Sequence, residues 1–475
     1  MLFNSLVFLV FIAVFFPLFF ATRGLVRIAI CLVASYVFYG WWDWRFLSLI
    51  ALSTVVDYTL GLALDKEERE RRRKTLLTLS IVMNLGLLAV FKYFNFFIDS
   101  FQDAISIFGI TDSLVELRII LPVGISFYTF QTMSYSIDLY RRKIEVERNF
   151  LRFATYVAFF PQLVAGPIVR ASHLLPQFRR DQPFVWNAFL SGLGLVLVGY
   201  FKKVVVADSL APVVDTAFGN PEAMTALGML IGVFFYAFQI YCDFSGYSDI
   251  AIGLARMLGY DFGLNFRTPY FSRSFSEFWQ RWHISLSSWL RDYLYISLGG
   301  NRKGVAKTYR NLMLTMLLGG LWHGASWTFV FWGWLHGMYL IVQRLIGETY
   351  AKGVERAGIP AWIKDGVAML TVFLFTCLAW VFFRSPDFAT AMTVLTQIGG
   401  MENLSFAAVT NKVLVLKGFV LISVLLVGEV LALRTPMTEQ VLAQPAWRVV
   451  GFAALLWAIA LLGNFTGGQF IYFQF

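Results

Sequence analysis

Residues 311–338 read NLMLTMLLGGLWHGASWTFVFWGWLHGM, two apolar runs joined by a short polar break. Each run, at 311–322 and 327–345, approaches the length of a helix that crosses a bilayer. Two histidines lie in this stretch, His323 at the break and His336 in the second run. The stretch therefore predicts a helical hairpin in a membrane protein that keeps ionisable side chains at membrane depth.

The composition of the whole chain agrees with a membrane location. Of the 475 residues, 58% are hydrophobic and 14% are charged, whereas a soluble globular domain carries about 25% charged residues. The mean hydropathy is +0.66. A soluble core cannot hide this much apolar surface, so lipid must cover much of it.

The formal net charge of +10 does not indicate a nucleic-acid partner, because the Lys and Arg residues lie mainly in short loops between the apolar runs. Basic residues in such loops fix the orientation of a membrane protein. Residues 3–21 have no basic region before them, so they predict a first span that starts outside the membrane and not a cleaved signal peptide. Counting spans from there places the basic stretches 65–74 and 141–148 in the cytoplasm. The acidic loop 98–117 then lies outside.

Thirteen apolar runs are long enough to span or nearly span a bilayer. Several are interrupted, notably around Pro122, Pro161, Pro167 and Gly319–Gly320. Broken backbone is tolerated at membrane depth only where protein or water satisfies it, so these breaks predict re-entrant or half-length helices. We expect an all-α, polytopic integral membrane fold with about 10–12 transmembrane helices.

The four histidines differ in context. His173 lies in a polar loop and is expected at the surface, and His283 lies on an amphipathic, Trp-rich segment. His323 is the strongest functional candidate, because an ionisable side chain at membrane depth is costly. Glycines at 319, 320 and 324 would allow the close backbone approach that a narrow substrate channel requires. For His336 a structural role and a supporting role are equally favoured.

Two carboxylates, Asp243 and Asp249, also lie in an apolar context and need partners there. We expect structural ion pairs for them, more than direct catalysis. The candidate partners are Arg267, Arg273, Arg281 and Arg291. Glu277 and Arg281 stand four residues apart and predict a local pair on a helix.

The sequence lacks several motifs that would indicate other kinds of chemistry. No phosphate-binding GxxxxGK[ST], zinc-binding HExxH or nucleophile-elbow GxSxG pattern is found. Cys31, Cys242 and Cys377 lie in apolar stretches without metal-ligand spacing, so we expect structural thiols and no metal site. The remaining chemistry suits acyl transfer, in which a neutral imidazole takes the proton of a hydroxyl that attacks a thioester.

The histidine-bearing segments are similar to the membrane-bound O-acyltransferase (MBOAT) family, and in particular to its bacterial members that O-acetylate alginate, cellulose or peptidoglycan. The segments that carry the resemblance are WHISLSSWLRDYLYISLGGNR (282–302), the stretch 311–338, LPVGISFYTFQTMSYSIDLYRRK (121–143), FFPQLVAGPIVR (159–170) and YCDFSGYSDIAIGLARMLGYDFGLNFRTPY (241–270). The likeness covers nearly the whole chain. It implies one MBOAT-like membrane domain over 1–475, with a catalytic core segment at 281–338 and an aromatic tail at 466–475.

The resemblance also implies an activity and a location. The protein would be a multi-pass component of the bacterial inner membrane that takes acetyl groups from acetyl-CoA, a donor substrate and not a bound cofactor. A periplasmic SGNH-type acetyltransferase partner would place them on a polysaccharide. The family's catalytic WHG histidine maps onto His323, and a second polar position about forty residues upstream maps onto His283.

Two further expectations concern the substrates. Basic residues near the cytoplasmic ends could attract the phosphates of coenzyme A, with ordinary positive-inside anchoring as the alternative; they are Lys202, Lys203, Arg302 and Lys303. In the tail GGQFIYFQF, Tyr472 is either an interfacial anchor or, like Tyr-bearing motifs of related acylation systems, a transient acetyl acceptor. A serine of the partner is the other candidate acceptor.

Three other functions remain open at this point. One is a lipid or protein O-acyltransferase of the same superfamily. Another is a transporter or flippase for a lipid-linked sugar, because broken helices and buried charges suit it equally. A scaffold for a secretion complex is disfavoured by the two histidines His283 and His323.

Overall fold

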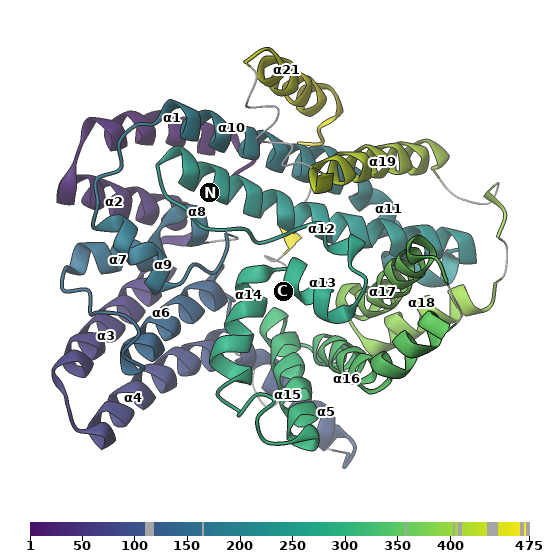
Figure 1. Cartoon of the computed structure of the whole chain (residues 1–475), viewed down its shortest axis with the longest axis horizontal. Helices are drawn as coiled ribbons and strands as arrows, with labels where there is room; N and C mark the ends of the chain where they lie inside the picture. Colours follow the sequence, from purple (N-terminus) through teal and green to yellow (C-terminus); the bar gives the residue numbers. More distant parts are fainter. Residues whose placement is uncertain are drawn as a thin grey trace. The chain divides into compact units, whose positions relative to one another are not determined.

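The structure is a computed structural model, and it is all-α over the residues that it describes, which contain no strand (Figure 1). These residues are 1–109, 118–163, 166–356, 359–401, 404–406, 411–434, 445–465 and 470–471, without the side chains of 348–356, 432 and 434. The chain forms two compact units. Unit 1 comprises residues 1–189 and 254–262, and unit 2 comprises residues 190–253 and 263–475.

Unit 1 contains nine α-helices and two short turns of other helix types among the described residues. They are α1 (Leu6–Ala21), α2 (Gly24–Asp43), η1 (Trp44–Phe46), α3 (Leu47–Lys66), α4 (Glu70–Leu88), η2 (Ala89–Tyr93), α5 (Phe94–Ser106), α6 (Ile125–Tyr140), α7 (Phe150–Ala158), α8 (Phe160–Leu163) and α9 (Ala171–Phe178). Helices α3, α4 and α6 share a buried polar network. The carboxylate of Asp57 accepts hydrogen bonds from Ser80, Asn84 and Ser136, so this buried acid is held entirely by neutral donors.

Unit 2 carries the remaining helices, with α10 and α12 each reaching into both units. They are α10 (Trp186–Tyr200), η3 (Phe201–Ala207), α11 (Asp208–Gly219), η4 (Pro221–Ala223), α12 (Ala226–Met257), η5 (Pro269–Phe271), α13 (Phe275–Arg281), α14 (Ile284–Trp289), η6 (Leu290–Tyr295), α15 (Val305–His323), α16 (Trp327–Arg356), α17 (Ala361–Arg384), α18 (Phe388–Gly399), α19 (Lys412–Arg434) and α21 (Pro445–Leu462).

Seven helical stretches of the described chain are long and apolar enough to cross a membrane. They are Gly24–Lys66, Glu70–Ser106, Trp186–Gly219, Ala226–Met257, Ala361–Arg384, Lys412–Leu431 and Pro445–Leu462. The expected polytopic, all-α membrane fold is therefore confirmed. The expected number of about 10–12 crossings stays a prediction.

The proline breaks occur as expected, but the glycine break does not. Pro122 precedes the start of α6, and Pro161 lies in α8, which has only four residues. The expectation of a break at Gly319–Gly320 is wrong, because α15 runs without interruption from Val305 to His323. The physical reason is helix packing. A β-carbon on Gly320 would overlap the carbonyl oxygen of Phe329 on α16.

The two helices of the 311–338 hairpin are held together by backbone contacts at glycine. A β-carbon on Gly333 of α16 would overlap the carbonyl oxygen of Met316 on α15. One turn further along α16, a β-carbon on Gly337 would lie 2.8 Å from the sulfur of Met313. As the residue number rises along α16, the number of the facing residue on α15 falls, so α15 and α16 run antiparallel. The absence of side chains at these glycines lets the two backbones meet.

We predict that Gly333→Ala destabilises the protein although alanine favours helix. The added methyl group would push α15 and α16 apart, at a cost of about 1–3 kcal/mol. Gly347→Ala on the same helix is the matched control, because nothing lies within 4 Å of a β-carbon there. Thermal unfolding in detergent should show a lower midpoint for Gly333→Ala and an unchanged or higher one for Gly347→Ala. Equal midpoints would contradict the contact.

Candidate functional site

His323 is the last residue of α15, at the tip of the hairpin, and its side chain is buried. Three aromatic rings meet the imidazole edge-on. The ring of Trp322 lies 5.1 Å from it, that of Trp332 5.0 Å and that of Phe383 5.5 Å, measured between ring centroids. The fold therefore surrounds this histidine with apolar surface in an enclosed place, as the sequence predicted for an ionisable residue at membrane depth.

His283 lies beside His323 although forty residues of sequence separate them. It precedes α14 in a left-handed conformation, with φ of 43°, which is uncommon for a residue other than glycine. The two imidazole centroids are 6.5 Å apart, and the ring of Trp322 contacts both. The structure thus brings together the two histidines for which the resemblance implies a catalytic role.

Asn265 fixes the orientation of His283 and was missed by the sequence analysis. Its Oδ1 accepts a hydrogen bond from the backbone N–H of Ser285 at 3.2 Å and faces Nδ1 of His283 at 3.2 Å. A backbone N–H can only donate, so the atom at this point is the amide oxygen. The facing Nδ1 of His283 then carries the proton, and the lone pair of a neutral ring is at Nε2. Asn265 itself is held by a hydrogen bond from its Nδ2 to Ser248 at 3.0 Å.

His283 is uncharged at neutral pH. It lies between two short helices, outside the seven candidate spans, and its side chain is fully buried. Burial lowers the pKa of His283 to about 3, because the charged imidazolium loses its hydration. A neutral imidazole with its lone pair on Nε2 is chemically able to accept a proton.

His336 lies on α16, also fully buried, and contacts a different part of the same aromatic cluster. Its ring centroid is 4.7 Å from that of Trp332 and 5.0 Å from that of Trp279. Trp332 also contacts His323, so this indole connects the two histidines. Neither ring nitrogen of His336 has a hydrogen bond to a described residue.

The glycines around His323 pack helices together and do not line a channel. Gly319 and Gly320 face Leu290 and Phe329, and the ring of Phe329 packs directly on Gly324. The close approach predicted at these positions is therefore present, but its partner is the protein's own backbone and side chains. The channel interpretation of these glycines is wrong.

The prediction that arginines pair with Asp243 and Asp249 is also wrong. Both aspartates lie on α12 and pair with lysines of η3: Asp243 with Lys203 at 2.6 Å, and Asp249 with Lys202 at 2.7 Å. Lys203 also pairs with Asp208 at 2.7 Å. The lysines precede the aspartates by about forty residues, and only the packing of η3 on α12 brings them together. The structural ion pairs that we expected are therefore present with other cations.

These pairs change the interpretation of the four basic residues that were expected to attract coenzyme A. Lys202 and Lys203 are enclosed and bound to carboxylates, with only 14% and 2% of their side chains exposed. They do not present charge to a ligand in solution, and that expectation is wrong for them. Arg302 and Lys303 are exposed, so for these two it stays a prediction.

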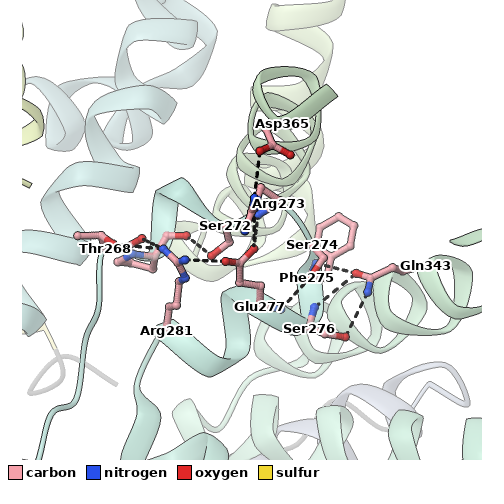
Figure 2. Close-up of polar contacts among 11 residues, drawn as sticks. Thr268, Ser272, Arg273, Ser274, Phe275, Ser276, Glu277, Arg281, Gln343 and Asp365 are labelled. Carbon is pink, nitrogen blue, oxygen red and sulfur yellow. Dashed lines mark hydrogen bonds and ion pairs between the residues drawn. The ribbon is translucent and has the colours of Figure 1, made fainter. Parts of the chain in front are cut away.

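The expectations for Arg281, His173 and the three cysteines are confirmed. Arg281 pairs with Glu277 at 2.6 Å within α13, as local support (Figure 2). His173 has 47% of its side chain exposed. The three cysteines are free and buried. Among the described residues, no group of three or more His, Cys, Asp or Glu side chains is placed to hold a metal ion.

Tyr472 lies outside the described residues, but the two residues before it are buried in unit 2. The N–H of Ile471 donates to Oδ2 of Asp243 at 2.7 Å. Phe470 packs on Tyr247 and Phe244, with ring centroids 4.4 and 5.8 Å apart. Phe244 in turn meets the ring of His283 at 4.6 Å. The segment before Tyr472 therefore packs against the wall of the histidine site.

A comparison with known protein families decides the class of this chain. The model of the membrane-bound O-acyltransferase family matches residues 36–385, which include both His283 and His323. The chain belongs to the MBOAT family. It is therefore an acyltransferase, and the transporter and scaffold alternatives no longer apply.

Individual relatives in the MBOAT family agree with this assignment. The protein named probable alginate O-acetylase AlgI of Azotobacter vinelandii is 45% identical over 393 residues, 82% of this chain and 76% of that protein. The peptidoglycan O-acetyltransferase of Helicobacter pylori is 36% identical over 408 residues, 80% and 75% of the two chains. The teichoic acid D-alanyltransferase of Streptococcus thermophilus is 29% identical over 236 residues, 46% and 56% of the two chains.

We predict that Asn265 is required for full activity of this acyltransferase. Asn265→Ala removes the acceptor that holds Nδ1–H of His283, so the lone pair would no longer be confined to Nε2. The turnover number should fall about tenfold, less than the roughly 10²–10⁴-fold contributed by an acid–base group itself, because Asn265 acts only through the orientation of His283. Asn265→Asp keeps an acceptor oxygen and should recover part of the loss. Turnover at saturating donor measures both, and equal losses in the two variants would contradict the orienting role.

Proposed function

We propose that the protein is the membrane component of a polysaccharide O-acetylation system. It takes acetyl groups from cytoplasmic acetyl-CoA and passes them through the bacterial inner membrane. A periplasmic SGNH-type acetyltransferase then places them on an extracytoplasmic polymer of the alginate, cellulose or peptidoglycan type. The relatives named for alginate and peptidoglycan O-acetylation support this polymer class over a lipid or protein acceptor.

The observation that carries the proposal is the pair of buried histidines. His283 and His323 lie 6.5 Å apart between ring centroids, and at most 2% of either residue is exposed. Acyl transfer from a thioester needs a base but no metal or nucleotide, and dry surroundings limit loss of the acyl group to hydrolysis. The pair meets both requirements.

In the proposed reaction His323 is the general base, and His283 orients the donor or the acceptor. The acceptor oxygen attacks the thioester carbonyl while its proton passes to His323. The carbon–sulfur bond then breaks, the thiolate leaves, and the proton of His323 passes to the sulfur. One ester and one thiol are formed from one thioester and one alcohol, and the histidine returns to its neutral state.

We predict that His323→Ala abolishes polymer acetylation in cells without loss of folded protein. The base would be missing, so the acetyl content of the polymer should fall to the level of a strain without the gene. His173→Ala is the matched control and should keep full acetylation, because His173 is half exposed. Size-exclusion profiles of both variants in detergent report folding. A folded His323→Ala protein that still supports acetylation would disprove the assignment.

We propose further that Tyr472 accepts the acetyl group before it leaves the protein. The burial of Phe470 and Ile471 against the histidine site supports a tail that reaches this region. With radiolabelled acetyl-CoA and no partner protein, the wild type should become labelled, and Tyr472→Phe should not. Tyr36→Phe in unit 1 is the control. Undiminished labelling in Tyr472→Phe would assign the acetyl group to another residue of this chain. Undiminished polymer acetylation in a Tyr472→Phe protein that is not labelled would assign the acceptor role to a hydroxyl of the partner.

A further inference from the structure

The chain after α21 returns to η3 and α12, where its described residues are held at two points. At the first point the backbone N–H of Asn464 donates to the carbonyl of Val204 at 2.8 Å, and Nδ2 of Asn464 donates to the carbonyl of Asp208 at 3.2 Å. Val204 lies in η3, a π-helical stretch between two α-helices, and such stretches are frequently found at functional sites. The first point therefore holds the C-terminal segment against η3.

The second point is the backbone amide of Ile471. Its N–H donates to Oδ2 of Asp243 on α12 at 2.7 Å, and only 6% of Ile471 is exposed. The ring of Phe470 is buried beside it against Tyr247, one turn further along α12, with 4.4 Å between the ring centroids. A buried backbone N–H needs an acceptor, and a charged carboxylate is a stronger acceptor than a neutral carbonyl. Asp243 therefore holds the segment by a strong hydrogen bond.

Lys203 fixes the carboxylate that accepts from this amide. Its Nζ lies 2.6 Å from Oδ1 of Asp243 and 2.7 Å from Oδ1 of Asp208, and 2% of the lysine side chain is exposed. With all three groups ionised, one positive charge faces two negative charges. Buried carboxylates need further hydrogen bonds on the oxygens that the cation does not satisfy. The N–H of Ile471 supplies one of these bonds, on the second oxygen of Asp243.

This contact lies next to the histidine site. The ring of Phe244 meets that of His283 at 4.6 Å and that of Phe470 at 5.8 Å, measured between centroids. Adjacent Cα atoms of a chain are about 3.8 Å apart, so a fixed Ile471 limits where the next residue, Tyr472, can lie. A side chain that holds Ile471 therefore acts on Tyr472 through the chain.

We propose that Asp243, fixed by Lys203, is a positioning residue: it holds the C-terminal segment at the amide of Ile471 and so keeps Tyr472 within reach of the histidine site. The proposal rests on the proposed role of Tyr472 as acetyl acceptor. It gives this ion pair a task in the reaction besides joining η3 to α12.

Two substitutions on α12 form a matched test. Asp243→Asn keeps the shape of the side chain, but an amide has one acceptor oxygen, so its NH2 group must face either the ammonium of Lys203 or the N–H of Ile471. Asp249 lies six residues, or about 9 Å, further along the same helix and pairs with Lys202 at 2.7 Å. Asp249→Asn therefore weakens an equivalent pair between the same two elements at a distance from Ile471.

Two measurements are made on the full chain in detergent. Hydrogen exchange of the Ile471 amide, followed by mass spectrometry of the C-terminal peptide, reports whether the segment is held. The initial rate of labelling by radiolabelled acetyl-CoA, without partner protein, reports acetyl capture. In Asp243→Asn the exchange should be about tenfold faster and the labelling about tenfold slower, because a hydrogen bond to a charged acceptor is lost. Asp249→Asn should stay within about twofold of wild type in both measurements.

Ile471→Pro tests the same contact from the other side and leaves both ion pairs intact, so it carries the test if Asp243→Asn does not fold. Proline has no N–H to donate, so labelling should fall about tenfold. Ile471→Val keeps the N–H and should keep the labelling rate. Equal labelling in Ile471→Pro and Ile471→Val would overturn the proposal.

The other outcomes separate the contact from the acceptor role. Unchanged exchange of the Ile471 amide in Asp243→Asn would overturn the proposal, as would equal changes in Asp243→Asn and Asp249→Asn. Faster exchange with undiminished labelling would overturn the positioning of Tyr472. Wild-type protein that is never labelled would overturn the proposed acceptor role of Tyr472, and a faster exchange in Asp243→Asn alone would still establish that Asp243 holds the segment.

Discussion

The site depends on the backbone contact between α15 and α16. Gly320 and Gly333 each leave room for a carbonyl oxygen of the opposite helix, so the two helices approach as closely as backbones allow. At that separation the centroid of the Trp332 ring lies 5.0 Å from that of His323. Residues in adjacent turns of α16 then follow along the same face. One packing constraint therefore places His323 against the aromatic residues of α16.

A second constraint is that charge at membrane depth must be neutralised inside the protein. In unit 2 the charged side chains named here pair with one another, and the groups that contact His323 are uncharged. Lys202 and Lys203 are committed to Asp249 and to Asp243 with Asp208, on η3, α11 and α12. The surroundings of His323 contain indoles, phenyl rings and neutral imidazole. The charged clusters hold the helices, and the proposed reaction at His323 would take place among neutral polar groups.

The sequence predicted what depends on local pattern and on motif. Apolar runs predicted the membrane helices, and the spacing of Glu277 and Arg281 predicted their pair. It could not predict contacts between segments distant in the chain. The four arginines that follow Asp243 and Asp249 in the chain were the expected partners. Nothing in the sequence pattern indicated that Lys202 and Lys203 would pair with these aspartates instead.

Glycine and asparagine show the same limit. Gly319–Gly320 suggests a break when read alone, and only the facing carbonyl of Phe329 explains why the helix continues. Asn265 lies in an irregular stretch with no periodic signal, and its role depends on the left-handed backbone of His283 folding back onto it. Positions of this kind are defined by the partner that tertiary structure supplies.

The neutral surroundings of His323 also suit the proton movement of the proposed reaction. The alcohol loses a proton and the thiolate gains one, so no net charge remains when the acyl group has moved. Charge exists only briefly, on the imidazolium and on the thiolate or oxyanion near it, and these opposite charges lie close together in a medium of low dielectric constant. A fixed lysine or carboxylate beside His323 would add a permanent buried charge that no step of the cycle removes. A second histidine avoids this cost: His283, held by Asn265 as the Nδ1–H tautomer and neutral at physiological pH, supplies a lone pair without a charge.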